Sequence, residues 1–349
     1  MSNVVSLGLP RRLSLAERQG LFIHNFATNR RAHDDVFWLK ENAELLNVLA
    51  STGAALPDAA LAPYRRVYDG LNKRMRFFPQ YYRFLLSICL DLEDLGIGHG
   101  KGTALCDWTA KMGLADAELS DLQRAEAHRL LSRRGAVRED PALTQRLHHF
   151  INRSETFALP NKKAAYELTH IVFYLSDYGV CDPQLDENAR VSLEFAGLLA
   201  YLDQDIDLLA EICVALRFAG QHPSEIWEDW IASQMQGFSL ENSAAKGPDA
   251  YHEYLVSSWW AQISDNMTFP GVPSPNGLHI SRRGTRKGPL RAMSEYMFHL
   301  GDARSSDWNL MRDAMSDVVG ADDEDILMGA EQSSDRFGAF FEGFSRVDS

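Results

Sequence analysis

The stretch AAYELTHIVFYLSDYG, residues 164–179, decides the fold class of this chain. Its apolar side chains recur at the three- and four-residue spacing of one helical face, as at Leu168, Ile171 and Leu175. Gly179 ends the stretch, and a glycine just past a helix adopts a left-handed conformation that strains other residues. The pattern predicts a helix that stops shortly before Gly179.

Four other stretches repeat this design. YYRFLLSICLDLEDLG ends at Gly96 and QDIDLLAEICVALRFAG ends at Gly220, and both align with the first stretch without gaps. Two weaker copies, WLKENAELLNVLASTG and LQRAEAHRLLSRRG, end at Gly53 and Gly135. The closing glycines recur about every 41 residues, which indicates a repeat architecture. A leucine stands four residues before each glycine, at Leu49, Leu92, Leu131, Leu175 and Leu216.

A second amphipathic helix lies between these helices, so that each unit is a helical hairpin. We expect these second helices at 59–77, 103–112, 142–151 and 188–202. After Gly220 the register weakens, and helices at 224–235 and 251–263 fill a unit that lacks its glycine. Further helices at 307–319 and 324–341 finish the chain, and no strand pattern is evident.

The organisation follows from the repeat. We predict one all-α domain over 1–349, with an N-terminal extension at 1–30 and regular hairpins at 31–220. Divergent hairpins fill 221–349 and contain a long loop at 266–289. Hairpins of this length build either an α/α toroid or an open HEAT-like α-solenoid. A toroid encloses a central pocket, whereas a solenoid offers a concave surface.

The bulk composition limits the partners. The net charge of -13 would repel nucleic acid and an anionic membrane. No apolar run has the length of a signal peptide core or a membrane span, which favours a cytoplasmic protein. The four cysteines lack the spacing of a zinc site or a disulfide scaffold, so we expect reduced thiols.

One position of the repeat is polar in every unit. Nine residues before each closing glycine stand Glu44, Ser87, Glu126, His170 and Glu211. In the fourth unit this face also carries aromatic side chains, which a merely solvated face rarely does. We therefore expect it to line a cleft or to meet another surface.

These positions supply the candidate catalytic residues. His170 is the side chain that changes protonation most readily near neutral pH, and neighbouring carboxylates would tune it. The alternative is an interhelical hydrogen bond from His170 in a packed seam. The proposed catalytic set is His170, Asp177, Tyr174 and Glu211. The proposed substrate-binding set on the glycine-terminated helices is Tyr166, Glu126 and Asp94.

Metal and cofactor binding are not expected. His170 with Glu211, Glu126 or Asp94 would offer nitrogen and oxygen ligands, but no HExxH or paired ExxH spacing is present. The acidic run LDQDID, 202–207, precedes a helix, where capping and the helix dipole explain its carboxylates.

The segment PGVPSPNGLHISRRGTRKGP, 270–289, is the longest expected loop. Its cations Arg282, Arg283 and Arg286 stand out in an acidic protein. They would bind an anionic group of a substrate as a lid, or the segment is a solvated connection.

The helix ELTHIVFYLSDYG, closing at Gly179, resembles a helix of uncharacterised bacterial families built from repeated helical hairpins. The likeness extends to DIDLLAEICVALRFAG. Alternating helices round a centre also resemble the α/α toroid class, which includes glycosidases, terpene cyclases and lanthionine cyclases. The class implies a central pocket, but its decisive motifs, DxDD, repeated QW and a zinc-binding Cys/His set, are absent from this sequence.

Two functions remain open at this point. The first is an acid–base enzyme that modifies a small molecule or peptide in a central pocket. The second is a non-catalytic helical-repeat module that binds a protein or peptide partner. Concentration of Tyr, His and Asp in one unit favours the enzyme.

Overall fold

The structure is a computed structural model that describes residues 13–243, 249–266, 268–284, 286–321 and 323–347. This part of the chain forms seventeen α-helices and one two-stranded sheet, which confirms the all-α class. Residues 1–12 of the expected N-terminal extension lie outside the described residues, as do 267 and 285 of the expected loop. None of the described helices combines the length and the apolar character needed to cross a bilayer.

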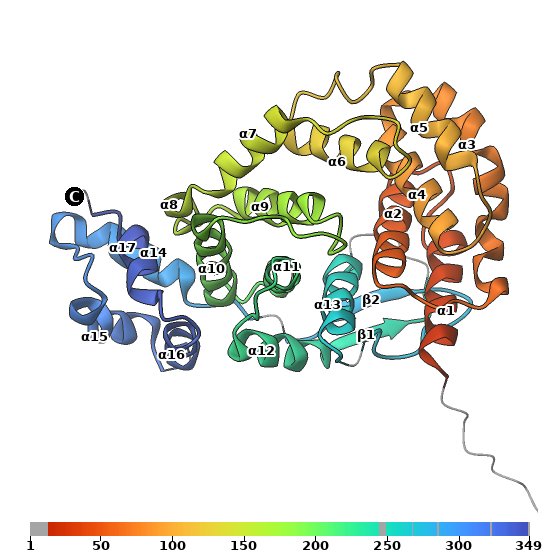
Figure 1. Cartoon of the computed structure of the whole chain (residues 1–349). Coiled ribbons are helices and arrows are strands. Elements are labelled where there is room, and N and C mark those ends of the chain that lie inside the picture. The colour runs from red at the N-terminus through yellow and green to blue at the C-terminus, as the bar shows by residue number, and fades with distance from the viewer. Residues whose placement is uncertain (1–12, 244–248, 267, 285, 322, 348–349) are drawn as a thin grey trace, which may run out of the picture.

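Six helices, one from each hairpin, surround a common centre (Figure 1). Each contacts the next along the chain, and the sixth, α13, also contacts the first, α2, so the contacts form a closed cycle. We call these the inner helices. They are α2 (Val36–Ser51), α4 (Tyr82–Asp94), α6 (Asp121–Ser132), α9 (Lys162–Leu175), α11 (Ile206–Phe218) and α13 (Tyr251–Ile263).

The ends of the inner helices follow the expected chemistry. The five closing glycines all have positive φ, between 63° at Gly53 and 98° at Gly96. The sixth unit has no glycine there, and Asp265 takes the left-handed conformation with φ of 56°. Aspartate tolerates this region better than most residues, because its short side chain can hydrogen-bond locally. The repeat therefore continues into α13 without its most visible sequence mark.

Six other helices pack outside the inner helices, and most of them contact two inner helices. They are α1 (Leu15–Thr28), α3 (Arg65–Phe77), α5 (Lys101–Lys111), α7 (Pro141–Ile151), α10 (Glu187–Leu202) and α12 (Glu225–Met235). Helix α1 falls within the segment expected to be an extension, yet it packs on α2 as the outer helix of the first hairpin. The helix expected at 59–77 begins as a 3-10 helix because Pro63 lies within its first turns. The shorter elements here are η1 (Asp58–Tyr64), η2 (Pro79–Tyr81) and α8 (Ser154–Phe157).

The sheet was not predicted from the sequence. Strands β1 (Phe238–Glu241) and β2 (His279–Arg282) pair antiparallel, with Leu240 opposite Ile280. Strand β2 lies inside the segment expected to be a loop. Each strand has only four residues and its partner is distant in the chain, so neither gives the alternating pattern of a longer strand.

The C-terminal helices lie outside the ring beside α10 (Figure 1). They are α14 (Leu290–Leu300), η3 (Gly301–Ala303), α15 (Trp308–Val319), α16 (Glu324–Gln332) and α17 (Phe337–Ser345). The single helix expected at 324–341 is in fact two, because the chain turns at Ser334, whose hydroxyl accepts a hydrogen bond from the amide of Arg336. Trp308 then packs against Phe337 and Phe341.

A buried ion-pair cluster joins the first and last hairpins of the ring. Arg30, which follows α1, has no exposed side-chain surface and contacts Glu41 at 2.9 Å and Asp249 at 2.7 Å. It also donates to the backbone oxygen of Leu278 beside β2. We call Arg30, Glu41 and Asp249 the clasp. It connects α2 to the segment that begins α13.

The clasp controls protonation of Asp249. Burial would raise the pKa of this carboxyl, but the hydrogen bonds and charge of Arg30 more than offset burial and hold the pKa below its usual range. The ion pair is therefore intact at neutral pH.

Replacing Arg30 with alanine would leave the buried carboxylate of Asp249 without its arginine, whereas Glu41 would keep its ion pair with Arg31 at 2.8 Å. We expect Arg30→Ala to lower the free energy of unfolding by about 3–5 kcal/mol, as when one partner of a buried ion pair is removed. Urea denaturation measures the change. Arg291→Ala, at an exposed arginine that pairs with Glu295, is the matched control and should leave stability unchanged. An equal effect in both variants would contradict the clasp.

The clasp also predicts a pH dependence. A carboxyl whose pKa is depressed by folding contributes stability above its unfolded pKa and loses it as pH falls through the folded pKa. The stability difference between the wild-type chain and Asp249→Asn should therefore be constant at neutral pH and shrink below about pH 4. Urea titrations between about pH 7 and pH 3 test this. A difference that stays constant over the whole range would count against the ion pair.

Candidate functional site

Side chains from all six inner helices line one cavity of about 240 Å³ at the centre of the ring. The five residues that stand nine positions before the closing glycines are all among its lining. Glu44, Ser87, Glu126, His170 and Glu211 thus come from five different helices to one space. Counting back nine positions from Asp265, which follows α13, gives Val256, and this residue lines the cavity as well. The polar position of the repeat therefore faces inward.

A second layer of inward residues lies one helical turn closer to the helix N-termini. Tyr166 on α9, Asp207 on α11 and His252 on α13 each stand thirteen positions before the residue with positive φ that follows their helix. These following residues are Gly179, Gly220 and Asp265. Tyr166 donates to Asp207, and Asp207 accepts from His252. Residues at the same repeat position thus contact each other, so neighbouring inner helices run parallel and in register.

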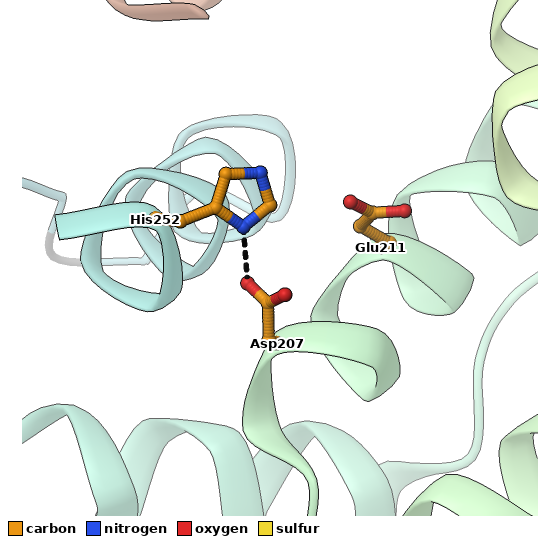
Figure 2. A group of neighbouring side chains, drawn as sticks. All are labelled: Asp207, Glu211 and His252. Carbon is orange, nitrogen blue, oxygen red and sulfur yellow. Dashed lines mark hydrogen bonds and ion pairs between the residues drawn. The ribbon is translucent and has the colours of Figure 1, made fainter. Parts of the chain in front are cut away.

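Asp207, Glu211 and His252 form a compact cluster, in which one ligand atom from each lies within 4.8 Å of the others. Nδ1 of His252 is 2.7 Å from Oδ1 of Asp207. Figure 2 shows the imidazole of His252 over Asp207, with the carboxyl group of Glu211 directed toward the same space. Asp207 and Glu211 are four residues apart on α11 and so share one helical face. We call these three residues the central cluster.

The two carboxyl groups of the central cluster differ in their electrostatics. Burial raises the pKa of Glu211. Burial would also raise the pKa of Asp207, but the hydrogen bond and charge of His252 outweigh it and lower that pKa. Burial would lower the pKa of His252, and the contact with Asp207 reverses this and raises it to about 9. At neutral pH the chain holds an Asp207–His252 ion pair beside a carboxyl group that resists ionisation.

Two hydroxyl groups hold the carboxylates in place. Tyr166 donates to Oδ2 of Asp207 at 2.7 Å, and Thr169 donates to Oε2 of Glu211 at 2.6 Å. Both donors lie on α9, next to α11 in the ring. Asp207 is therefore held through both oxygens, by Tyr166 and His252, whereas Oε1 of Glu211 accepts no hydrogen bond from the described residues.

His170 faces the cavity with one ring nitrogen already committed. Its Nδ1 is 2.7 Å from the backbone oxygen of Tyr166, which can only accept, so Nδ1 carries the proton of the neutral ring. Nε2 is then the nitrogen with a free lone pair. Nδ1 also lies 3.7 Å from Oε2 of Glu211. The hydrogen bond of His170 thus lies within α9 and not between helices, which the alternative had expected, and the side chain lines the cavity.

Aromatic rings form the part of the cavity nearer the C-terminal ends of the inner helices. Phe173 packs edge-on against Trp259 at 4.9 Å between ring centres, and Tyr178 packs against Trp259 at 5.6 Å. Tyr174 and Phe84 complete this wall. The indole N–H of Trp259 is buried and has no hydrogen-bond partner within the described residues. The cavity is thus polar at one end and aromatic at the other.

The other charges at the polar end are paired. Lys40 lies 3.0 Å from Glu44, and Tyr251 also donates to Glu44 at 3.0 Å. Arg83 forms ion pairs with Glu126 and with Glu118. Glu126 is therefore a lining residue whose charge is balanced, unlike Glu211.

Several candidate residues lie away from the cavity lining. Asp177 forms an ion pair with Arg129 at 2.7 Å, and Asp94 contacts Arg133 and Arg134. Tyr166 stands behind Asp207 as a hydrogen-bond donor. The structure thus brings His170, Tyr174, Glu211 and Glu126 together at the cavity, and places Asp177 and Asp94 in ion pairs between helices.

The three arginines of the expected anion-binding lid also lie away from the cavity lining. Arg282 contacts Glu253 at 2.7 Å, and Arg286 forms an ion pair with Asp323. The backbone amide of Arg283 donates to Gly237, which extends the contact between β1 and β2. This segment connects the ring to the C-terminal helices through the sheet.

Sequence reasoning left out His252 and explained Asp207 as part of a capping run. Asp205 does cap α11 by accepting from the amide of Leu208, whereas Asp207 turns into the cluster. Both residues stand thirteen positions before the residue of left-handed conformation that follows their inner helix, Gly220 for Asp207 and Asp265 for His252. For His252 this repeat position could not be read from the sequence, because Asp265 replaces the glycine and the register could not be carried into α13.

The central cluster has the donor set of a metal site, with two carboxylates and one imidazole on two adjacent helices. No metal-binding spacing is visible in the sequence, because His252 lies 41 residues from Glu211. In chemical terms the cavity can hold a small molecule against an aromatic wall and present it with a free imidazole nitrogen and a buried carboxyl group.

A buried carboxyl group with one neutral donor lowers stability in the free protein. We expect Glu211→Gln to raise the free energy of unfolding of chelator-treated protein by about 1–2 kcal/mol at neutral pH, because the amide removes a group that is costly to ionise and still accepts from Thr169. Urea denaturation measures it. Glu126→Gln, which loses a balanced ion pair with Arg83, should not stabilise. A decrease for Glu211→Gln would refute this account.

The comparisons with known proteins bear on the whole chain. No curated protein and no solved structure matched it. A family model described as a domain of unknown function, DUF6902, matches residues 1–347. This agrees with the resemblance to an uncharacterised family of helical hairpins. The chain belongs to the family of the domain of unknown function DUF6902.

Proposed function

We propose that this chain is an enzyme that converts a small molecule in the central cavity of an α/α-toroid-like ring. The observation that carries the proposal is the convergence of side chains from all six inner helices on one cavity. A degenerate repeat that served only as a scaffold would have no reason to place polar residues at its inward position. Buried polar side chains cost stability unless they are used or paired.

His170 is the proposed acid–base group. Its Nδ1–H is fixed by the Tyr166 carbonyl, so the ring cannot turn freely and Nε2 keeps one direction. A substrate proton within about 3 Å of Nε2 would be transferred to it, as general base catalysis requires. The central cluster would then stabilise charge that develops on the substrate.

The shape of the cavity supports a small, amphipathic substrate. Its volume of about 240 Å³ is at the lower end of pockets that hold small molecules. Phe173, Tyr178 and Trp259 would pack against a flat or apolar part of the substrate. The reactive polar part would lie toward Glu211 and His170.

Binding of a protein or peptide partner by a non-catalytic module is less well supported. Such a module would present its polar positions along an open groove, and here the inner helices contact each other in a closed cycle. We further propose a cytoplasmic location, which the four free cysteines support, since Cys89, Cys106 and Cys213 are buried thiols that need no oxidising compartment.

The test compares the wild-type chain with His170→Ala in an extract of small metabolites, followed by mass spectrometry. We expect the wild-type chain to deplete one compound and form its product, and His170→Ala to slow this at least about 100-fold. His149→Ala, at an exposed histidine on the outer helix α7, is the matched control and should keep full activity. Circular dichroism verifies that the variants are folded.

Equal turnover by the wild-type chain and His170→Ala would rule out His170 as the acid–base group. A compound that binds to the cavity and leaves unchanged would reject the enzyme and indicate a small-molecule binding protein.

A further inference from the structure

We propose that the central cluster, Asp207, Glu211 and His252, binds one divalent transition-metal cation. The three residues come from the facing surfaces of α11 and α13 and lie at the polar end of the cavity (Figure 2). Two carboxylate oxygens and one imidazole nitrogen are ligands that Zn²⁺ and Mn²⁺ accept.

The distances allow a single ion to reach all three groups. Two atoms bound to one ion at about 2.1 Å lie about 3.4 Å apart in a tetrahedral site. The ligand atoms here lie within 4.8 Å of one another, so side-chain rotations that move these atoms by about 1 Å would bring them into range. The ion would replace the proton now shared between His252 and Asp207 at 2.7 Å.

Glu211 gives an independent reason to expect a cation. Its side chain is 3% exposed and directed into the cluster, and its only hydrogen bond within the described residues comes from the neutral hydroxyl of Thr169. The two imidazoles beside it are already engaged, His170 by the backbone oxygen of Tyr166 and His252 by Asp207. A buried carboxylate needs a balancing charge, and a metal ion supplies one.

The surroundings also resemble the support that metal ligands receive. Ligating carboxylates are commonly held by further hydrogen bonds, and here Tyr166 holds Oδ2 of Asp207 while Thr169 holds Oε2 of Glu211. Oε1 of Glu211 is left for the ion, and Oδ1 of Asp207 would exchange its hydrogen bond from His252 for a bond to the ion. His170 stands beside the cluster with Nε2 free.

With three protein ligands the ion would keep an open position toward the cavity, which is the arrangement of catalytic metal sites. Its catalytic use rests on the proposed function, whereas its binding can be measured without a substrate. The imidazole ligand favours Zn²⁺ or Mn²⁺ over Mg²⁺, which prefers oxygen ligands and retains its water.

The experiment is isothermal titration of the full-length chain with Zn²⁺ and, separately, Mn²⁺, after treatment with EDTA and dialysis. We expect about one ion per chain. Glu211→Gln and His252→Gln should weaken binding at least about 100-fold, and Thr169→Val, which removes only the supporting hydroxyl, about 10-fold. Glu126→Gln is the matched control, since it removes a carboxylate from the same cavity outside the central cluster, and should bind as the wild-type chain does.

Mn²⁺ electron paramagnetic resonance on the same variants reports binding directly and does not depend on activity, and circular dichroism identifies any variant that fails to fold. Absence of binding to the wild-type chain would overturn the inference, as would equal binding by the wild-type chain and Glu211→Gln. Turnover that persists in EDTA would reject a catalytic ion and leave His170 in place. One bound ion without turnover would support the site and reject the enzyme.

Discussion

The clasp formed by Arg30, Glu41 and Asp249 is the contact on which the rest of the structure depends. Each hairpin of the ring packs against its neighbours through local contacts, as repeat proteins do. The first and last hairpins, however, are far apart in the chain, and closing a loop of that length has an entropic cost. A fully buried arginine between two carboxylates holds the two ends together with a specific geometry.

Closure fixes the register of the inner helices, and the register makes the site. Because Tyr166, Asp207 and His252 occupy the same repeat position on three successive helices, they lie at one height and bond in sequence. The layer one turn further along brings Glu44, His170 and Glu211 to the same cavity. If one hairpin slid by a turn, it would separate His252 from Asp207. Catalytic groups are best held on rigid elements in this way.

The central cluster is also where the fold departs from good packing. A neighbouring lining carboxylate, Glu126, has a balancing arginine, whereas Glu211 is buried with one hydroxyl donor. Residues of this kind lower stability and are usually retained for function. The aromatic wall at the other end of the cavity is packed ring against ring.

The sequence by itself determined the helical hairpin, its length, the glycine that ends it and the polar position that faces inward, because these depend on residues within one or two helical turns. His170 and Glu211 could be named from that position. The sequence did not reveal His252, since Asp265 replaces the glycine that marks the register, and it did not place Asp177 and Asp94 in ion pairs with arginines of other segments. The short β1–β2 pairing and the contact of α13 with α2 join residues far apart in the chain. Such contacts are decided by tertiary packing, which local patterns do not encode.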